Sequence, residues 1–243
     1  MSSLPDRTTA RLDRDRPVTV VGAGPARLMC AIALARNGPR VVVHEWHAEV
    51  GHRFHGDFQG LENWSSARDV LEELAQAGIT PDFDHVAVSE GTVFDPTGAA
   101  HRVRSARPLY YLVRRGRMAG TLDSVLLQQA HAAGVTINLS SRENRVVGAA
   151  VLAGGPREAD AIAVDHLFET DMPDGDFLAL DDSLAPLGYA YLLVHGGRGT
   201  VAICMFTGFK QQAEYLRRTV AFFAERARLA MCNPKPFGGF ANF

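Results

Sequence analysis

The segment VTVVGAGPARLMC, residues 18–30, decides how the first part of the chain should fold. It begins with a short apolar run, Val18–Val21, continues through a glycine turn and ends in a stretch with apolar residues at helical spacing. A continuous apolar run is typical of a parallel strand that is buried on both faces. Pro25 falls at the first helical position, where its missing N–H breaks no hydrogen bond. The segment therefore predicts a strand, a tight turn and a helix.

A second strand should follow this helix. Residues 37–39, Asn-Gly-Pro, end the helical pattern, and Val41–His44 is again a continuous, largely apolar run. Glu45 comes directly after this run, at about the spacing from Gly22, roughly 20 residues, that the ribose-binding acid of a dinucleotide fingerprint has. The strand, turn, helix, strand and terminal acid together predict a dinucleotide-binding βαβ unit. An acid in this place also disfavours a 2′-phosphate on the ligand.

The fingerprint G-x-G-x-x-G is incomplete, because Arg27 stands in its third glycine place. Gly22 permits the tight turn, and Gly24 lets the backbone approach a pyrophosphate at the helix N-terminus. The third glycine lets the helix pack closely on the sheet, so we expect Arg27 to overpack this contact at a cost of about 1–3 kcal/mol. That cost would weaken dinucleotide binding roughly ten- to a hundredfold without abolishing it. Two interpretations stay open: the guanidinium meets the pyrophosphate, or the site is degenerate.

Composition excludes several classes of function. The chain has 243 residues, 47% of them hydrophobic, and a net charge of −2, so nothing in its charge favours binding to nucleic acid or to an anionic membrane. The cysteines and histidines show no ligand spacing, which predicts no metal site. Residues 1–16 are polar and predict a disordered tail rather than a signal peptide. No apolar run is long enough to span a membrane, and we expect a cytoplasmic protein.

The remaining pattern predicts an α/β fold in two parts. Up to about residue 155 we expect a Rossmann-like parallel sheet with helices, and after it an antiparallel sheet with one long helix. The predicted helices are 66–78, 121–134 and 211–230, and the further strands are 135–139, 150–153, 162–168, 189–195 and 200–206. The domains are therefore the tail 1–16, a nucleotide-binding domain 17–155 and a substrate-type β-sheet domain with a helix, 156–243.

Several stretches resemble the FAD-dependent oxidoreductases of the geranylgeranyl reductase and aromatic hydroxylase superfamily. VGAGPARLMCAIALARNGPRVVVHE, residues 21–45, resembles the first βαβ unit of these proteins, and residues 50–53, Val-Gly-His-Arg, resemble their Gly-Gly-Arg turn. YLVRRGRMAGTLDSVLLQQAHAAGV, residues 111–135, is similar to their Arg segment before an Asp-led helix. Residues 153–155, Ala-Gly-Gly, correspond to their ATG strand, and GYAYLLVHGG, residues 188–197, is similar to a stretch of the geranylgeranyl reductases in which Trp and Pro stand in place of Tyr191 and Val194.

The resemblance implies FAD as the cofactor, with NAD(P)H as a possible electron donor and a small-molecule or lipid-like substrate. It leaves the catalytic residues unassigned and the oligomeric state unknown. It implies cofactor contacts from Gly22, Gly24, Pro25, Ala26, Arg27, Glu45, Gly51, Arg53, one of Arg114 and Arg115, and Gly154.

The resemblance also implies that the C-terminal third of the architecture is missing, so the substrate domain is expected to be incomplete. In these families a later strand ends in Gly-Asp beside the flavin. Here Gly175-Asp176 falls in the polar stretch MPDGDF and is predicted to be a turn. The final stretch NPKPFGGFANF, residues 233–243, shows no pattern of a closing element.

Candidate groups for chemistry are few. Residues 53–64 follow the first flavin turn and predict an ordered loop, although His55 and Asp57 could donate protons from it. Tyr189, Tyr191 and Phe206 fall on the predicted antiparallel strands, where they would line a substrate cavity or form plain core.

Three functions remain open. The first is an FAD-dependent oxidoreductase, and the second is an incomplete or degenerate flavoprotein without turnover. The third, which the Arg segment before the Asp-led helix disfavours, is an NAD-dependent dehydrogenase.

Overall fold

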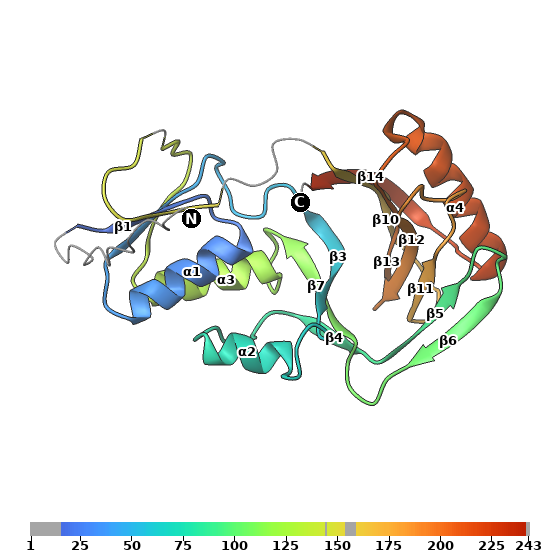
Figure 1. Cartoon of the computed structure of the whole chain (residues 1–243), viewed down its shortest axis with the longest axis horizontal. Coiled ribbons are helices and arrows are strands. Elements are labelled where there is room, and N and C mark those ends of the chain that lie inside the picture. The colour runs from blue at the N-terminus through green and yellow to red at the C-terminus, as the bar shows by residue number, and fades with distance from the viewer. Residues whose placement is uncertain (1–15, 144, 154–158, 242–243) are drawn as a thin grey trace, which may run out of the picture.

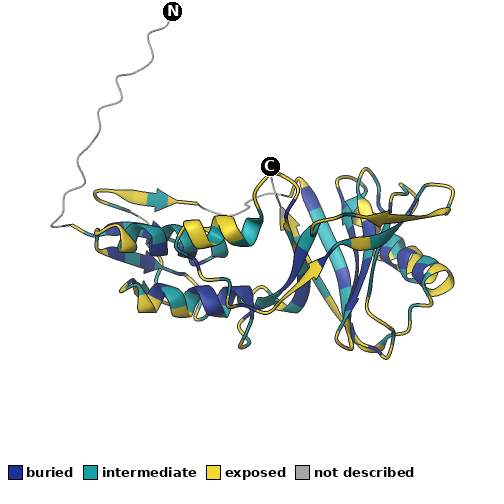
Figure 2. Ribbon diagram, turned by 90° about the horizontal axis from the view of Figure 1, so that it is seen from below, coloured by how far each residue is buried: buried dark blue, intermediate teal, exposed yellow. Residues whose placement is uncertain are grey.

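The computed structural model describes residues 16–143, 145–153 and 159–241. Two lobes lie at opposite ends of the long axis, with a small sheet between them (Figure 1). Buried and half-buried residues run along the sheets and helices of both lobes (Figure 2). The helices are α1 (Pro25–Arg36), α2 (Val70–Gln76), α3 (Leu122–Ala132) and α4 (Gln212–Arg226), with a short 3-10 helix at Phe209–Gln211. The predicted tail lies outside the described residues except for Arg16.

The first lobe contains the predicted parallel sheet. Its strand order is β8-β2-β1-β9, and every neighbouring pair is parallel. The bounds are β1 (Val18–Val21), β2 (Val41–His44), β8 (Thr136–Asn138) and β9 (Ala150–Leu152), which confirms the predicted strands. Helices α1 and α3 lie side by side and pack on this sheet (Figure 1). The core between them includes the fully buried Val20, Leu28, Ile32, Val43 and Leu126.

Local chemistry fixes the ends of the helices. Thr121 caps α3, since its hydroxyl accepts a hydrogen bond from the Ser124 amide at 3.3 Å. The predicted start of α2 at Ser66 is wrong: the helix begins at Val70, with Asp69 as the N-cap accepting from the Leu71 amide at 2.9 Å. The hydroxyl of Tyr111 donates to the same carboxylate at 2.8 Å. Asp69 is thereby fixed outside the helix, so the helix cannot begin earlier.

A three-stranded antiparallel sheet of order β3-β7-β4 lies between the lobes. Its strands are β3 (His55–Glu62), β4 (His85–Val88) and β7 (Tyr110–Gly116). The predicted loop at residues 53–64 is therefore wrong for most of its length. Gly56, Asp57 and Gly60 give β3 a weak strand pattern, and pairing with β7 forms the strand nevertheless.

The second lobe is built on a seven-stranded sheet of order β14-β10-β13-β12-β11-β5-β6. Its neighbours pair antiparallel except β11 and β5, which are parallel. Helix α4 packs on this sheet with Leu216 and Phe223 in the core. The strands are β5 (Glu90–Phe94), β6 (Ala100–Arg104), β10 (Ala161–Glu169), β11 (Gly175–Ala179), β12 (Tyr189–His195), β13 (Arg198–Met205) and β14 (Cys232–Ala241).

Two stretches of this lobe correct the sequence expectations. Gly175 and Asp176 do not form a turn but begin β11, which pairs with both β12 and β5. The chain also has an element near its end, because β14 pairs with β10 at the edge of the sheet. An edge position tolerates Pro234 and Pro236, whose missing N–H groups would break a central strand.

The sheets do not follow the order of the chain. Strands β5 and β6 precede residue 155, the predicted domain boundary, yet they complete the sheet of the second lobe. The boundary stays a prediction, and the second sheet draws strands from both sides of it. Within the described ranges, none of the helices has both the length and the apolar content needed to cross a bilayer.

Candidate functional site

An open cavity of about 1240 Å³ lies at the carboxyl ends of β1 and β2, beside the N-terminus of α1. This is larger than most ligand pockets, which measure roughly 300–1,000 Å³. The carboxyl edge of a parallel sheet is also the usual place for ligands in open α/β folds. The predicted site residues that line the cavity are Gly22, Gly24, Pro25, Ala26, Arg27, Glu45, Gly51, Arg53 and Arg115.

Glu45 is fixed where β2 ends. Its carboxylate accepts hydrogen bonds from the Ala23 amide at 2.7 Å and from the His47 amide at 2.9 Å, one at each oxygen. These bonds tie the carboxylate to the glycine turn and to the segment after β2. An ionised carboxylate has about four lone-pair positions, so acceptor capacity remains for two hydroxyls of a ligand. This geometry suits a ribose.

The glycine turn is open on its cavity side except for Arg27. Gly22 has a φ of +96°, a conformation that favours glycine. A Cβ at this position would lie 2.8 Å from Cζ and 2.9 Å from Cδ of Arg27. The Arg27 side chain therefore covers the turn, whereas Leu28, Ala31 and Ile32 are the buried residues of α1. The expectation that Arg27 overpacks the contact between helix and sheet is wrong, because its side chain points into the cavity.

The second predicted turn is packed against β7 and α3. Gly51 has a φ of +71°, and a Cβ there would lie 2.9 Å from the backbone of Gly116 and 3.0 Å from Cβ of Asp123. Arg115 binds the Asp123 carboxylate with two hydrogen bonds of 2.8 and 3.0 Å, and the Gly116 amide donates to the same carboxylate at 2.9 Å. Arg115 also donates to Gln59 at 2.6 Å. These bonds hold Arg115 rigidly in the cavity wall.

The structure separates the two candidate arginines of β7. Arg115 lines the cavity, whereas Arg114 is paired with Asp84 on another face of the strand and does not line it. This follows from the alternation of side chains along a strand. The predicted contact Gly154 lies outside the described residues, while its neighbour Ala153 lines the cavity.

Several lining residues were not predicted as cofactor contacts. The rings of His47 and His52 stack with centroids 3.3 Å apart, and His47 stacks on Trp46 at 5.5 Å. Burial, and then the nearby His47, lowers the pKa of His52. Arg142 lies over the Trp46 ring, 4.7 Å from its centroid. The sequence could have predicted these contacts only from position, because the side chains follow β2 or β8 at the carboxyl edge of the sheet.

The second lobe reaches this cavity through β14. Phe240 lines the cavity, and the guanidinium of Arg53 lies 5.2 Å from its ring centroid. Phe237, on the same strand, packs against Phe54 at 6.2 Å and against His55 at 5.8 Å. Figure 1 shows the end of β14 beside β3. Aromatic side chains from β14 and from the segment at the start of β3 thus lie together beside the cavity.

Two buried carboxyl groups lie where β3 and β10 meet. Asp57 and Asp165 are each 3% exposed. Burial raises the pKa of both; for Asp165, burial and the charge of Asp57 raise it to about 7. Asp165 Oδ1 has no hydrogen-bond partner in the described part of the chain. Asp57 accepts from the His55 amide at 3.1 Å and from Gln59 at 3.4 Å. Neither carboxyl lines the large cavity.

The aromatic candidates of the second lobe divide. Tyr191 packs against a small core of Phe58, Val88, Leu112 and Leu193, whereas Tyr189 and Phe206 are each 39% exposed. None of the three lines the large cavity. The core interpretation therefore fits Tyr191, and their substrate role stays a prediction.

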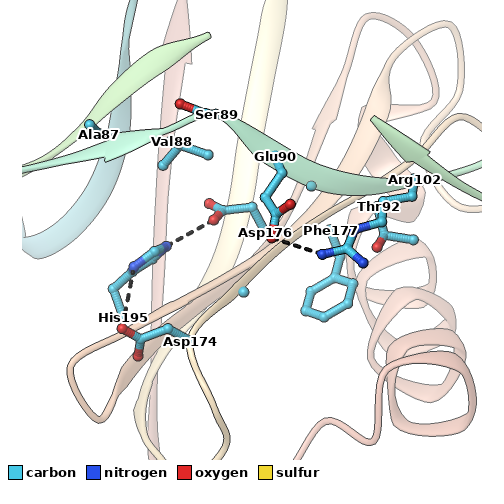
Figure 3. Close-up of a pocket in the computed structure, with 12 residues that line it drawn as sticks. Ala87, Val88, Ser89, Glu90, Thr92, Arg102, Asp174, Asp176, Phe177 and His195 are labelled. Atoms are coloured by element: carbon cyan, nitrogen blue, oxygen red, sulfur yellow. Dashed lines mark hydrogen bonds and ion pairs between the residues drawn. The ribbon is translucent and has the colours of Figure 1, made fainter. Parts of the chain in front are cut away.

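A second, smaller cavity of about 430 Å³ lies between β4 of the small sheet and strands β5, β11 and β12 of the second lobe (Figure 3). On its wall, Asp176 accepts from the Tyr110 hydroxyl at 2.7 Å and lies 2.9 Å from His195 Nε2. Burial opposes protonation of His195, but the hydrogen bond to Asp176 and the charges of Asp176 and Asp174 outweigh it and raise its pKa. This cluster was not predicted from the sequence, because Tyr110, Asp176 and His195 come from three separate strands, β7, β11 and β12.

Comparison with known sequences gives a short match. No family model matches the chain. A stretch of 37 residues is 51% identical to the putative oxidoreductase AegA of Escherichia coli strain K12, and it covers 15% of this chain and 6% of that protein.

Comparison with solved structures covers nearly all of the chain. A geranylgeranyl bacteriochlorophyll reductase-like protein from Thermoplasma acidophilum is similar with a TM-score of 0.65 and 19% identity, over 92% of this chain and 66% of that one. The flavin-dependent brominase Bmp2 is similar with a TM-score of 0.62 and 13% identity, over 91% and 66%. The protein CtdE, solved in complex with FAD, is similar with a TM-score of 0.60 and 14% identity, over 92% and 71%.

The chain spans about two-thirds of the length of these solved proteins. At such low identity the likeness concerns the fold. The α/β architecture, a parallel sheet joined to a largely antiparallel one, is thereby confirmed. The chain has the fold of the FAD-dependent oxidoreductases and monooxygenases, as the sequence resemblance indicates.

Proposed function

We propose that the chain binds FAD in the large cavity and is part of a flavin-dependent oxidoreductase. The observation that carries this proposal is the fixed carboxylate of Glu45, held beside an open glycine turn at the carboxyl edge of a parallel sheet. A ribose hydroxyl pair fits the first feature, and a pyrophosphate at the N-terminus of α1 fits the second. The fold shared with FAD-binding proteins supports the same assignment.

The residues present fit the cofactor. Glu45 would accept hydrogen bonds from the ribose, while Gly22 and Gly24 leave the turn without Cβ atoms. Arg115 would keep two of its five N–H donors for the ligand, because its other three are committed to Asp123 and Gln59. Bound FAD would supply the electron transfer. The chain's own part is to bind and orient the group, with Phe54 and Phe240 offering aromatic contacts from the cavity wall.

The proposal extends from the cofactor to the substrate and the electron donor. We propose a small or lipid-like organic substrate, and NADH or NADPH as the donor that reduces the flavin. The name of the geranylgeranyl bacteriochlorophyll reductase-like neighbour supports the lipid-like choice, and the complex of the structurally similar PqsL of P. aeruginosa with 2-aminobenzoylacetate supports the small-molecule choice.

The first test is the visible absorbance spectrum of the purified chain, before and after incubation with FAD, with identification of what heat releases. Flavin bands and stoichiometric FAD are expected. Thermal unfolding with FAD or NAD then separates the two dinucleotides, because a ligand at 100 times its Kd stabilises the folded state by about 2.7 kcal/mol. Stabilisation by NAD but not by FAD would instead support an NAD-dependent dehydrogenase.

A second candidate is a flavin-binding chain without turnover. Arg27 and His52 stand where the resembling families carry glycine, and both side chains line the cavity. Anaerobic addition of NADH or NADPH to the FAD-loaded protein distinguishes the two. Bleaching of the flavin bands is expected for the oxidoreductase, whereas bound FAD that neither donor reduces would favour the second candidate.

A further inference from the structure

The four arginines that line the cofactor cavity differ in what holds their guanidinium groups. Arg115 binds Asp123, while Arg53 lies over Phe240 and Arg142 over Trp46. Arg27 alone makes no hydrogen bond, ion pair or ring contact with any residue that the structure describes. It is the uncommitted cation of the cavity.

The position of this cation is defined by the glycine turn. Side chains of a helix lean toward its N-terminus, so Arg27 in the first turn of α1 extends back over Gly22. Its Cζ and Cδ lie 2.8 and 2.9 Å from where a Cβ of Gly22 would be, and its Nη1 lies 3.6 Å from where a Cβ of Gly24 would be. The guanidinium thus lies over the two glycines that a pyrophosphate would approach.

Positive charge gathers at the glycine turn, which favours the binding of an anion there. The N-terminus of a helix carries a partial positive charge, so a second positive group there is unfavourable. Burial lowers the pKa of Arg27, and the charge of Glu45 opposes this shift. Glu45 makes no hydrogen bond to Arg27, because its printed partners are the amides of Ala23 and His47. A bound anion at the turn would satisfy both the helix and the guanidinium.

We propose that Arg27 is the phosphate-recognition residue of this cavity and pairs with the diphosphate of a bound dinucleotide. The inference rests on the proposed FAD site. The guanidinium turns away from Gly22 to admit the phosphates and then donates hydrogen bonds to their oxygens, as arginine does with phosphate elsewhere. An arginine in the third glycine place thus adds a ligand contact instead of removing one.

The test compares the ligand affinities of Arg27→Met, Arg27→Gln and Arg27→Lys with those of wild type. Flavin fluorescence measures the affinity for FAD, and calorimetry measures the affinity for ADP. ADP carries the diphosphate without the flavin. The matched control is Arg36→Met, an exposed arginine at the other end of α1. All variants are first compared with wild type by thermal unfolding, and Arg27→Gln serves if Arg27→Met does not fold.

The uncharged variants are expected to bind FAD and ADP roughly ten- to a hundredfold more weakly, the usual effect of losing a hydrogen bond to a charged group. Arg27→Lys should retain most of the affinity and the salt dependence, and Arg36→Met should bind like wild type. Unchanged or tighter binding of FAD and ADP by Arg27→Met and Arg27→Gln would overturn the inference.

The two proposals fail in different ways. Wild-type protein that binds ADP with this dependence on Arg27 but does not bind FAD would refute the proposed flavin function and leave the role of Arg27 standing. If the protein binds FAD equally well with and without the Arg27 side chain, the proposed role of Arg27 is refuted and the proposed flavin function stands. Wild-type protein that binds neither ligand would refute both.

Discussion

Glu45 is the residue on which the proposed ribose contact depends. Its two oxygens are held by amides from two different segments, so the carboxylate points into the cavity in one orientation. Such preorganisation lowers the entropy cost of binding. Removing the carboxylate therefore costs ligand contacts and also frees two backbone N–H groups.

We predict that Glu45→Ala binds FAD roughly ten- to a hundredfold more weakly than wild type, since hydrogen bonds to a charged group contribute about 1.5–3 kcal/mol. Flavin fluorescence titration measures the change. Glu49→Ala is the matched control, because Glu49 also lines the cavity but is paired with Arg117 at the surface. Unchanged affinity in Glu45→Ala would show that the ribose assignment is wrong.

Asp165 should make the stability of the protein depend on pH. Its folded-state pKa is about 7, against an ordinary value of 3.8. Between these values the folded chain keeps a proton that the unfolded chain has lost, so the free energy of unfolding falls as the pH rises through this window. Above pH 7 the whole contribution of the protonated Asp165 to the free energy of unfolding is lost, and this contribution is roughly 4 kcal/mol at most.

We predict that Asp165→Asn flattens this dependence, because the amide has no proton to lose. Urea unfolding at pH 5, 6, 7 and 8 measures it, and the exposed Asp171→Asn serves as the control. Asp57, whose pKa is also raised by burial, should leave a smaller residual slope. A slope in Asp165→Asn equal to that of wild type would show that Asp165 does not titrate in this range.

Between elements, the ion pair of Arg115 and Asp123 joins β7 to the first turn of α3. The Arg115 side chain is 12% exposed and that of Asp123 only 1%. Breaking such a buried pair usually costs 3–5 kcal/mol, because it leaves an uncompensated charge in the interior.

We predict that Arg115→Met lowers the free energy of unfolding by about 3–5 kcal/mol. The neighbouring Arg114→Met should cost no more than about 1 kcal/mol, because its partner Asp84 is largely exposed. Urea unfolding of the two variants at one pH gives the comparison. Equal losses would mean that the pair with Asp123 does not secure the contact between β7 and α3.

The elements that could be predicted are those whose signals are local. Val18–Val21 and Val41–His44 are largely apolar runs with a helix between them that begins at Pro25, and the structure confirms all three. Strands β3, β11 and β14 were missed because their sequences carry Gly, Asp or Pro and form strands only through distant partners. β-Propensity depends on such neighbours more than helix propensity does.

The candidate site divides in the same way. The fingerprint residues and Glu45 could be found because their spacing along the chain carries the geometry. Arg142 and Phe240 reach the cavity only through the order of the strands and the return of β14, which no short pattern encodes. The orientation of Arg27 likewise depended on three-dimensional structure, because the sequence allowed both a packing clash and a guanidinium that faces the cavity.

For the molecule as a whole, the path of the chain joins the two lobes. It leaves the first lobe before β5, returns after β6, and enters the second lobe again at β10. Phe237 of β14 then packs against Phe54 and His55 beside the large cavity, and the Phe58 amide donates to the Thr200 hydroxyl at 3.5 Å. The sheet of the second lobe is therefore completed by β5 and β6 from before residue 155, while β14 brings Phe240 to the cavity of the first lobe.

This topology leads to a prediction about the boundary near residue 155. Fragments 16–155 and 156–243, expressed separately, should each lack a cooperative thermal transition, whereas the whole chain unfolds cooperatively. The first would carry β5 and β6 without their partner β11, and the second would expose the edge of β11 that pairs with β5. Unpaired strand edges favour association and aggregation.

Circular dichroism melting of the whole chain and of both fragments measures whether each unfolds cooperatively, and fragments mixed in equal amounts give a control for reassembly. A fragment 16–155 that melts cooperatively and binds FAD would instead establish the first lobe as an independent nucleotide-binding domain, with β5 and β6 contributing nothing to its folding.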